Sequence, residues 1–151
     1  MRSTRYWLMA ALLCCSVAAN AKDGVIYKSS LGHSFVTGGI SEEEATQIKR
    51  NAKAFSLRLL FSLGNAGAWI TDVSVYIVDA NGNTMFSKKQ AGPLLYIDLP
   101  AGDYQIIAKY NDVKQSKRLM LAGEKPQRVI LNWKDETEEY ETNSKMDTNL
   151  E

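Results

Sequence analysis

The sequence has few of the residues on which metal centres and nucleophilic enzymes depend. Its 151 residues include one histidine, His33, and two cysteines, Cys14 and Cys15, which both lie in an apolar N-terminal run. Removal of that run would leave no cysteine, and therefore neither a disulfide bond nor a thiolate site. Zinc sites of histidine and cysteine and a cysteine–histidine nucleophile pair are then excluded, and His33 stands beside Ser34 without the pattern of a serine hydrolase.

A strong net charge is also missing. The chain has 18 lysines and arginines against 17 acidic residues. Loss of residues 1–21 would remove Arg2 and Arg5, which leaves 16 basic residues against 17 acidic ones and a net charge of −1. A chain without a basic excess lacks the electrostatic footprint of a nucleic-acid-binding protein, so we expect no nucleic-acid partner.

The N-terminus has the pattern of a secretory signal peptide over residues 1–21. Arg2 and Arg5 precede an apolar run at 6–19, and a small-x-small triplet ends at Ala21. We therefore expect cleavage after Ala21 and a periplasmic or secreted protein. The run is too short for a comfortable membrane anchor, so no stable membrane span is expected after cleavage.

The rest of the chain divides into an arm, one domain and a tail. Residues 22–40 have no clear period and predict an extended N-terminal arm with one strand near 34–37. Residues 41–133 have the length of one ordinary domain. Residues 134–151 contain seven acidic residues and two lysines, which predicts a disordered acidic tail. A partner-binding acidic tail is the alternative.

A short amphipathic helix is expected at the start of the domain. Ser41 and Glu44 have the spacing of a capping box, which predicts that the helix begins at Glu42 and that the glutamate accepts from the amide of Ser41. Apolar residues then repeat at helical spacing as far as Phe55, so we expect a helix over 42–54 with one buried face.

The period changes to two after the helix, which predicts strands to the end of the domain. Short turns such as Asn81-Gly82 and Asn111-Asp112 separate the strands and leave no room for crossover helices, so pairing should be mainly antiparallel. About seven strands of this kind indicate a mainly β protein with a two-sheet sandwich. The expected core residues are Leu57, Leu59, Phe61, Leu63, Val73, Val75, Ile77, Tyr104, Ile106, Ala108, Tyr110, Leu119, Leu121, Val129, Leu131 and Trp133.

The segment Leu99-Pro100-Ala101-Gly102-Asp103-Tyr104, with the turn Asp79-Ala80-Asn81-Gly82 before it, carries a family resemblance. The stretch from Thr37 to Trp133 resembles the carboxypeptidase regulatory-like domain, a transthyretin-like sandwich found in small exported bacterial proteins of unassigned function. The resemblance implies that Leu99, Pro100, Gly102 and Tyr104 are structural, with the tyrosine buried and its hydroxyl bonded to the backbone. It implies no catalytic residue.

A metal site has one weak candidate. Asp79, Asn81 and Asn83 place three side-chain oxygens at alternate positions, as at the start of a calcium loop. Gly82 falls too early for that loop and no glutamate closes it, so a tight hairpin is the preferred interpretation and no metal or other cofactor is expected.

Two features are candidates for binding a partner. Leu60, Tyr76, Ile107 and Ile130 fall opposite the core positions, on the expected outer face of one or both sheets, and could form an apolar partner face unless the helix and the N-terminal arm cover them. Trp69 follows Gly67 in a glycine-rich segment, where it could stack on a ligand or plug the end of the sandwich.

These observations favour a non-catalytic exported module that binds a protein or glycan of the cell envelope or the extracellular space. The alternative is an accessory domain for a carbohydrate or another small ligand. We expect no enzyme activity, because no constellation of nucleophile, base and oxyanion donors is present in the sequence.

Overall fold

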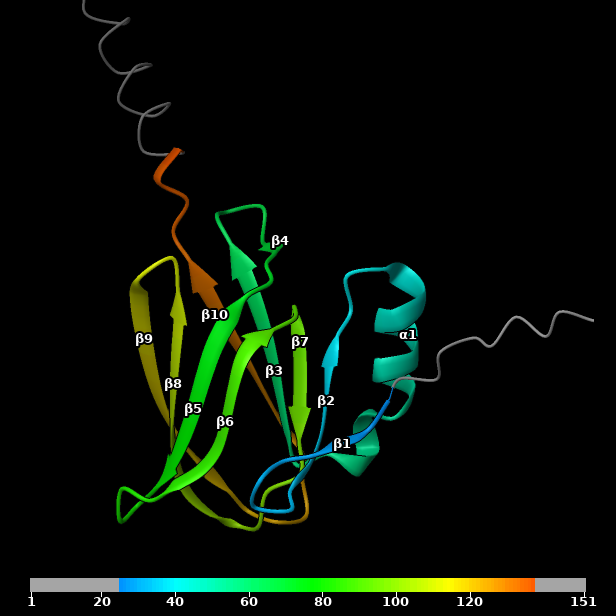
Figure 1. The fold of residues 1–151 in the computed structure, drawn as a ribbon, viewed down its shortest axis with the longest axis vertical. Helices are drawn as coiled ribbons and strands as arrows, with labels where there is room; N and C mark the ends of the chain where they lie inside the picture. The colour runs from blue at the N-terminus through cyan, green and yellow to red at the C-terminus, as the bar shows by residue number, and fades with distance from the viewer. Residues whose placement is uncertain (1–24, 138–151) are drawn as a thin grey trace, which may run out of the picture.

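The computed structural model describes residues 25–137, which form two β-sheets packed face to face and one short helix outside them (Figure 1). The elements are β1 (Tyr27–Lys28), β2 (Ser34–Gly38), α1 (Glu42–Arg50), the 3-10 helix η1 (Ala52–Ala54), β3 (Leu57–Leu63), β4 (Ala68–Trp69), β5 (Val73–Asp79), β6 (Thr84–Ala91), β7 (Leu94–Ile97), β8 (Gly102–Tyr110), β9 (Val113–Leu121) and β10 (Gln127–Trp133). The predicted signal peptide and most of the predicted acidic tail lie outside the described residues and stay predictions. None of the described helices is long and apolar enough to cross a membrane.

The two sheets have different sizes. The six-stranded sheet has the order β1–β2–β7–β3–β10, with β4 paired to the end of β3, and the four-stranded sheet has the order β6–β5–β8–β9. The mainly β, two-sheet prediction is confirmed. The described strands number ten rather than about seven because β1 and β4, with two residues each, are too short to produce an alternating pattern.

One strand pair departs from the antiparallel pattern. β10 runs parallel to β3, with Gln127 opposite Leu57 and Trp133 opposite Leu63. The chain leaves β9 in the four-stranded sheet and enters β10 in the other sheet, so no hairpin joins β10 to its neighbour. A strand that arrives from the opposite sheet can pair in either direction, which is why turn chemistry did not predict this pairing.

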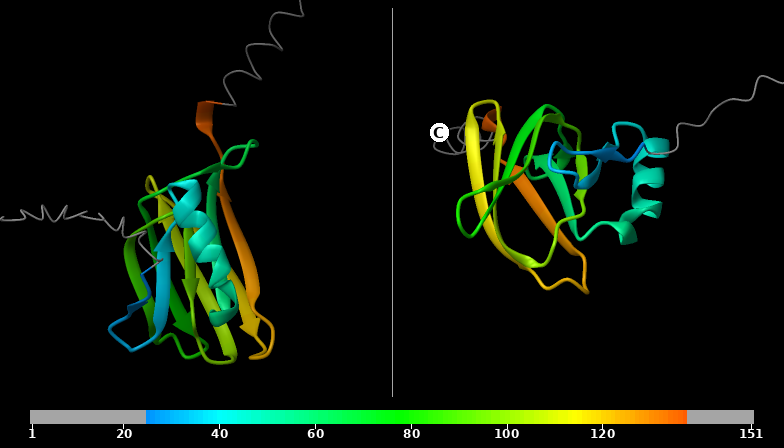
Figure 2. Two further views of the ribbon diagram at one scale, coloured as in Figure 1. Left: turned by 90° about the vertical axis from the view of Figure 1, so that its right-hand side faces the viewer. Right: turned by 60° about the horizontal axis from the view of Figure 1, so that its bottom comes forward.

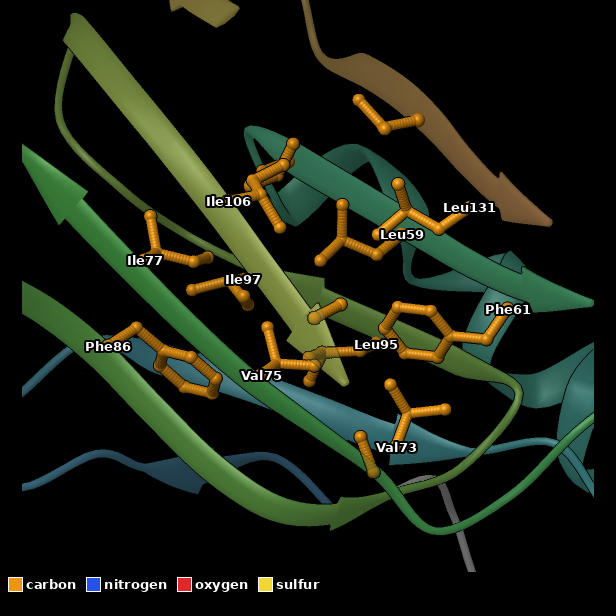
Figure 3. Packing of buried hydrophobic residues seen from close by; sticks show 14 of the residues in the cluster. Leu59, Phe61, Val73, Val75, Ile77, Phe86, Leu95, Ile97, Ile106 and Leu131 are labelled. Carbon is orange, nitrogen blue, oxygen red and sulfur yellow. The ribbon is translucent and has the colours of Figure 1, made fainter. Parts of the chain in front are cut away.

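The main hydrophobic cluster fills the space between the sheets (Figure 3). Leu59, Phe61 and Val75 are fully buried there, and the rings of Phe61 and Trp133 lie 6.3 Å apart in an edge-on arrangement. All of the predicted core residues either belong to this cluster or pack against it. The period-two pattern therefore located the core correctly.

Side chains join the two sheets where β9 and β10 lie at their edges. Gln115 Nε2 donates to the carbonyl of Asn132 at 2.7 Å, and Trp133 Nε1 donates to the carbonyl of Val113 at 3.0 Å. Edge strands with unpaired carbonyls invite pairing with other chains. These two bonds satisfy one edge carbonyl on each sheet from within the molecule.

The helix α1 begins where predicted but is shorter. Ser41 Oγ accepts from Glu44 N at 3.2 Å, whereas the Glu44 carboxylate accepts from the amides of Gly39 and Ile40 rather than from Ser41. The α-helix ends at Arg50, since Asn51 leaves the helical conformation and residues 52–54 form a 3-10 turn. Asparagine is a poor helix former and a common helix end, which accounts for the earlier stop.

A second hydrophobic cluster attaches α1 to the outer face of the six-stranded sheet. It consists of Val36, Ala45, Ile48, Phe55, Leu94 and Tyr96. The molecule thus has three layers, with the helix beside the larger sheet and far from the smaller one (Figure 2). The N-terminal arm does not cover a face, because β1 extends the edge of the six-stranded sheet by pairing with β2.

Candidate ligand groove

The outer face of the six-stranded sheet is only half covered. α1 packs on β2 and β7 through the second cluster, and the neighbouring strands β3 and β10 lie beside the helix (Figure 2). Leu60 on β3 packs against the edge of that cluster, whereas Ile130 next to it on β10 is 48% exposed. The helix therefore forms one wall of a recess whose floor is β3.

The four residues of the predicted partner face do not lie together. Leu60 and Ile130 are neighbours on the outer face of the six-stranded sheet. Tyr76 and Ile107 are neighbours on the four-stranded sheet, pointing out of the opposite side of the sandwich. The predicted outward positions therefore divide between the two sheets, because alternation identifies outward positions without telling which sheet a strand joins.

The recess between α1 and β3 is a groove of about 440 Å³. We call it the α1 groove and define it by Lys49, Arg58, Leu60, Trp69, Tyr96 and Arg128. Its size is within the range of small-ligand sites. Among the described residues, the side chains that line it include no carboxylate and no imidazole.

Three strands place a row of polar side chains at one end of the groove. Tyr96 on β7 lies opposite Arg58 on β3, and Arg58 lies beside Arg128 on β10. Burial raises the pKa of the Tyr96 hydroxyl, although the positive charges of both arginines act against that shift. Two arginines as direct neighbours repel one another, which makes this row unfavourable unless an anion lies nearby.

Arg58 is held in position by the backbone. Its Nε donates to the carbonyl of Ala52 in η1 at 2.9 Å. The bond fixes the plane of the guanidinium and leaves its two terminal nitrogens, which can bind an oxyanion in a bidentate manner. Within residues 25–137, Lys109 forms an ion pair with Asp112. No carboxylate in this range forms an ion pair with Arg58, Arg128 or Lys49.

Trp69 lies at the other end of the groove. It belongs to β4, where it pairs with Ser62, so it stands in a short hairpin rather than a loose loop. Its side chain is 44% exposed, which does not fit a plug at the end of the sandwich. The ammonium of Lys49 lies 5.1 Å from the centroid of its ring, in a cation–π contact across the groove from α1.

The weak metal candidate forms a turn. Asp79 Oδ1 accepts from the amides of Asn81 and Asn83 at 2.9 Å each, and Asp79 Oδ2 accepts from Asn83 Nδ2 at 3.2 Å. These bonds hold the pKa of Asp79 below its usual value, with the Asn83 amide as the largest cause. Among the described residues, no group of three or more acidic, histidine or cysteine side chains could hold a metal ion.

A larger hollow of about 550 Å³ lies beside that turn, between Asp79, Tyr104 and Arg118. The Asp79 carboxylate is already occupied by the turn, and Tyr104 is buried with its hydroxyl donating to the carbonyl of Pro100 at 2.7 Å. Leu99 is buried beside them, and Gly102 begins β8. Asp79 and Tyr104 therefore bond to the backbone here, and the hollow has one arginine, Arg118, where the α1 groove has two, so it is the weaker candidate of the two.

Sequence reasoning found Trp69 and Leu60 but missed Arg58, Arg128, Tyr96 and Lys49. In comparisons with known proteins, no family model matches this chain and no curated protein matches it significantly. The α1 groove is therefore identified as a candidate site from the positions of the residues that line it.

Proposed function

We propose that this chain is an exported, non-catalytic binding module of the carboxypeptidase regulatory-like, transthyretin-like type, and that its ligand lies in the α1 groove. The two-sheet sandwich and the bond from Tyr104 to Pro100 support the family assignment. The signal-peptide pattern of residues 1–21 supports export to the periplasm or the extracellular space.

The observation that carries the proposal is the pair of neighbouring arginines in a groove where no carboxylate of residues 25–137 pairs with them. Arg58 and Arg128 lie side by side, and the far end of the groove presents the exposed ring of Trp69. The repulsion between these like charges and the exposed part of the Trp69 ring are both unfavourable. A bound ligand from the cell envelope or its surroundings explains both features.

The size of the groove favours a small ligand over a protein partner. Stable protein interfaces bury on the order of 800 Å² on each side, usually over a broad surface. The α1 groove is a confined recess between one helix and one strand, which suits the carbohydrate or small-ligand alternative better than a large protein interface.

The test uses the mature chain, residues 22–151, labelled with ¹⁵N and mixed with a soluble cell-envelope extract. We expect shifts in the NMR signals of the Trp69 indole and the Arg58 side chain, with those of Tyr76 unchanged. Shifts confined to Tyr76 and Ile107 would move the binding surface to the four-stranded sheet. Consumption of an extract component at a rate that depends on the protein would contradict the non-catalytic assignment.

A further inference from the structure

The α1 groove has different chemistry at its two ends. Arg58 and Arg128 gather at one end, with the phenol of Tyr96 beside them. Trp69 lies at the other end, with Leu60 between, and the Lys49 ammonium lies 5.1 Å from its ring centroid, so the aromatic end also has a cation. A ligand that fits this order needs a negative group at one end and a body with both apolar and polar surface. Sugars have such bodies, because the C–H groups of their rings pack on apolar and aromatic side chains while their hydroxyls face water.

The length of the groove indicates more than one sugar ring. Trp69 lies opposite Ser62, which is four residues beyond Arg58 on β3. Four residues of an extended strand span about 13 Å. A disaccharide covers that distance, whereas a single hexose reaches only from the arginines to Leu60.

We propose that the α1 groove binds an acidic disaccharide unit, with a carboxylate or phosphate group on Arg58 and Arg128 and a neighbouring ring on Leu60 and Trp69. This inference rests on the proposed function and names the chemical class of its ligand.

The anionic group has a prepared site. Because Nε of Arg58 is bonded to the Ala52 carbonyl, the terminal nitrogens of this guanidinium are held in a fixed plane for a planar oxyanion. Arg128 is exposed on the edge strand β10 and can approach the same anion from the side. The anion removes the repulsion between the two arginines, so the acidic group contributes to affinity and to the stability of the complex.

The experiment compares two probes that differ in charge and hardly in shape: digalacturonic acid and its dimethyl ester. The mature chain contains Trp69 and Trp133, and Trp133 is buried with its indole bonded to Val113, so tryptophan fluorescence reports on Trp69. We expect a saturable fluorescence change with the acid, at least about tenfold weaker binding of the ester, and loss of acid binding as salt is raised.

Two arginine variants test the position of the site. Arg128→Gln should weaken binding of the acid about tenfold or more, since it removes a charged hydrogen-bond donor. Arg118→Gln is the matched control, because Arg118 is also an exposed arginine and lies on the edge strand β9 of the other sheet. Arg58→Lys keeps the charge but removes the planar fork, and it should also weaken binding of the acid.

Each other result has a definite meaning. Equal binding of acid and ester would overturn the acidic ligand while leaving the groove as a sugar site. Binding that is lost in Arg118→Gln and kept in Arg128→Gln would overturn the α1 groove itself and the proposed function with it. If neither probe nor a phosphorylated disaccharide binds, but an acidic peptide or the envelope extract still shifts the Trp69 signal, the sugar is wrong and the proposed function stands.

Discussion

The two hydrophobic clusters of this protein differ in size and in what they hold together. The main cluster lies between the sheets and includes Phe61, Val75 and Ile106, each shielded from solvent on both sides. The second cluster is smaller, lies under α1 and includes Ile48, Phe55 and Tyr96. The first cluster determines whether the chain folds, and the second determines whether the groove has its second wall. Stability of the sandwich and integrity of the groove should therefore be separable by mutation.

The largest effect is expected from a cavity in the main cluster. Phe61→Ala should lower the free energy of unfolding by about 3–5 kcal/mol, because Phe61 is completely buried and its neighbours cannot collapse into the space. Urea unfolding followed by circular dichroism measures the loss. Val113→Ala, at a half-exposed position, should change stability by less than about 0.5 kcal/mol. A similar loss in both variants would contradict the location of the core.

A smaller and more local effect is expected in the second cluster. Ile48→Ala should cost about 2 kcal/mol, at the low end for a buried isoleucine, since the cluster is small and borders solvent. Hydrogen exchange should show α1 amides losing protection while those of β5 and β8 keep it. Equal loss of protection in all three elements would show that the two clusters unfold as one unit.

A substitution at the N-cap of α1 also tests whether the helix can be weakened separately from the sandwich, because Ser41 belongs to neither hydrophobic cluster. Ser41→Ala removes the acceptor of the Glu44 amide and should cost about 1 kcal/mol, with affinity for the groove ligand reduced as α1 frays. Ser41→Asp keeps an acceptor at the same position and should retain most of the stability. Thermal unfolding of the two variants side by side measures the difference, and equal melting temperatures would contradict the role of the cap.

A small effect on stability should accompany a large effect on binding at Trp69. Trp69→Ala changes a side chain that is 44% exposed and lies outside both clusters, so the free energy of unfolding should fall by only about 1 kcal/mol, mainly from the lost contact with Lys49. Its affinity for the groove ligand should fall at least about tenfold, because a ring platform is lost. Calorimetric titration measures the affinity and thermal unfolding measures the stability. A destabilised variant with unchanged affinity would show that Trp69 stabilises the fold and does not contact the ligand.

Much of the fold could be predicted because each element has a local signal. The alternation of Leu57, Leu59 and Phe61 predicted burial, and Ser41 predicted the first residue of α1. Turn residues predicted the β8–β9 hairpin, in which Asn111 and Asp112 both have positive φ angles. The parallel pairing of β3 with β10 had no local signal, since it depends on the way the chain crosses between the sheets.

The groove was only partly predictable for the same reason. Arg58 precedes Leu60 by two residues, and Arg128 precedes Ile130 by two, so strand alternation places each pair on one outward face. What the sequence did not show is that these two strands are neighbours. Without knowledge of that pairing, two arginines far apart in the sequence are interpreted as separate surface charges. The cation–π contact of Lys49 with Trp69 likewise depends on where α1 is attached.

The parallel pairing of β3 and β10 also affects the order in which the protein can fold. Ser62 and Asn132, which hydrogen-bond across this pair, are 70 residues apart in the chain. Contacts between such distant segments form slowly, because a long loop must close before they bring any gain. Strand β3 therefore keeps one unpaired edge until the last strand has been synthesised. The six-stranded sheet therefore becomes complete only when β10, 64 residues beyond the end of β3, joins the strands that precede it.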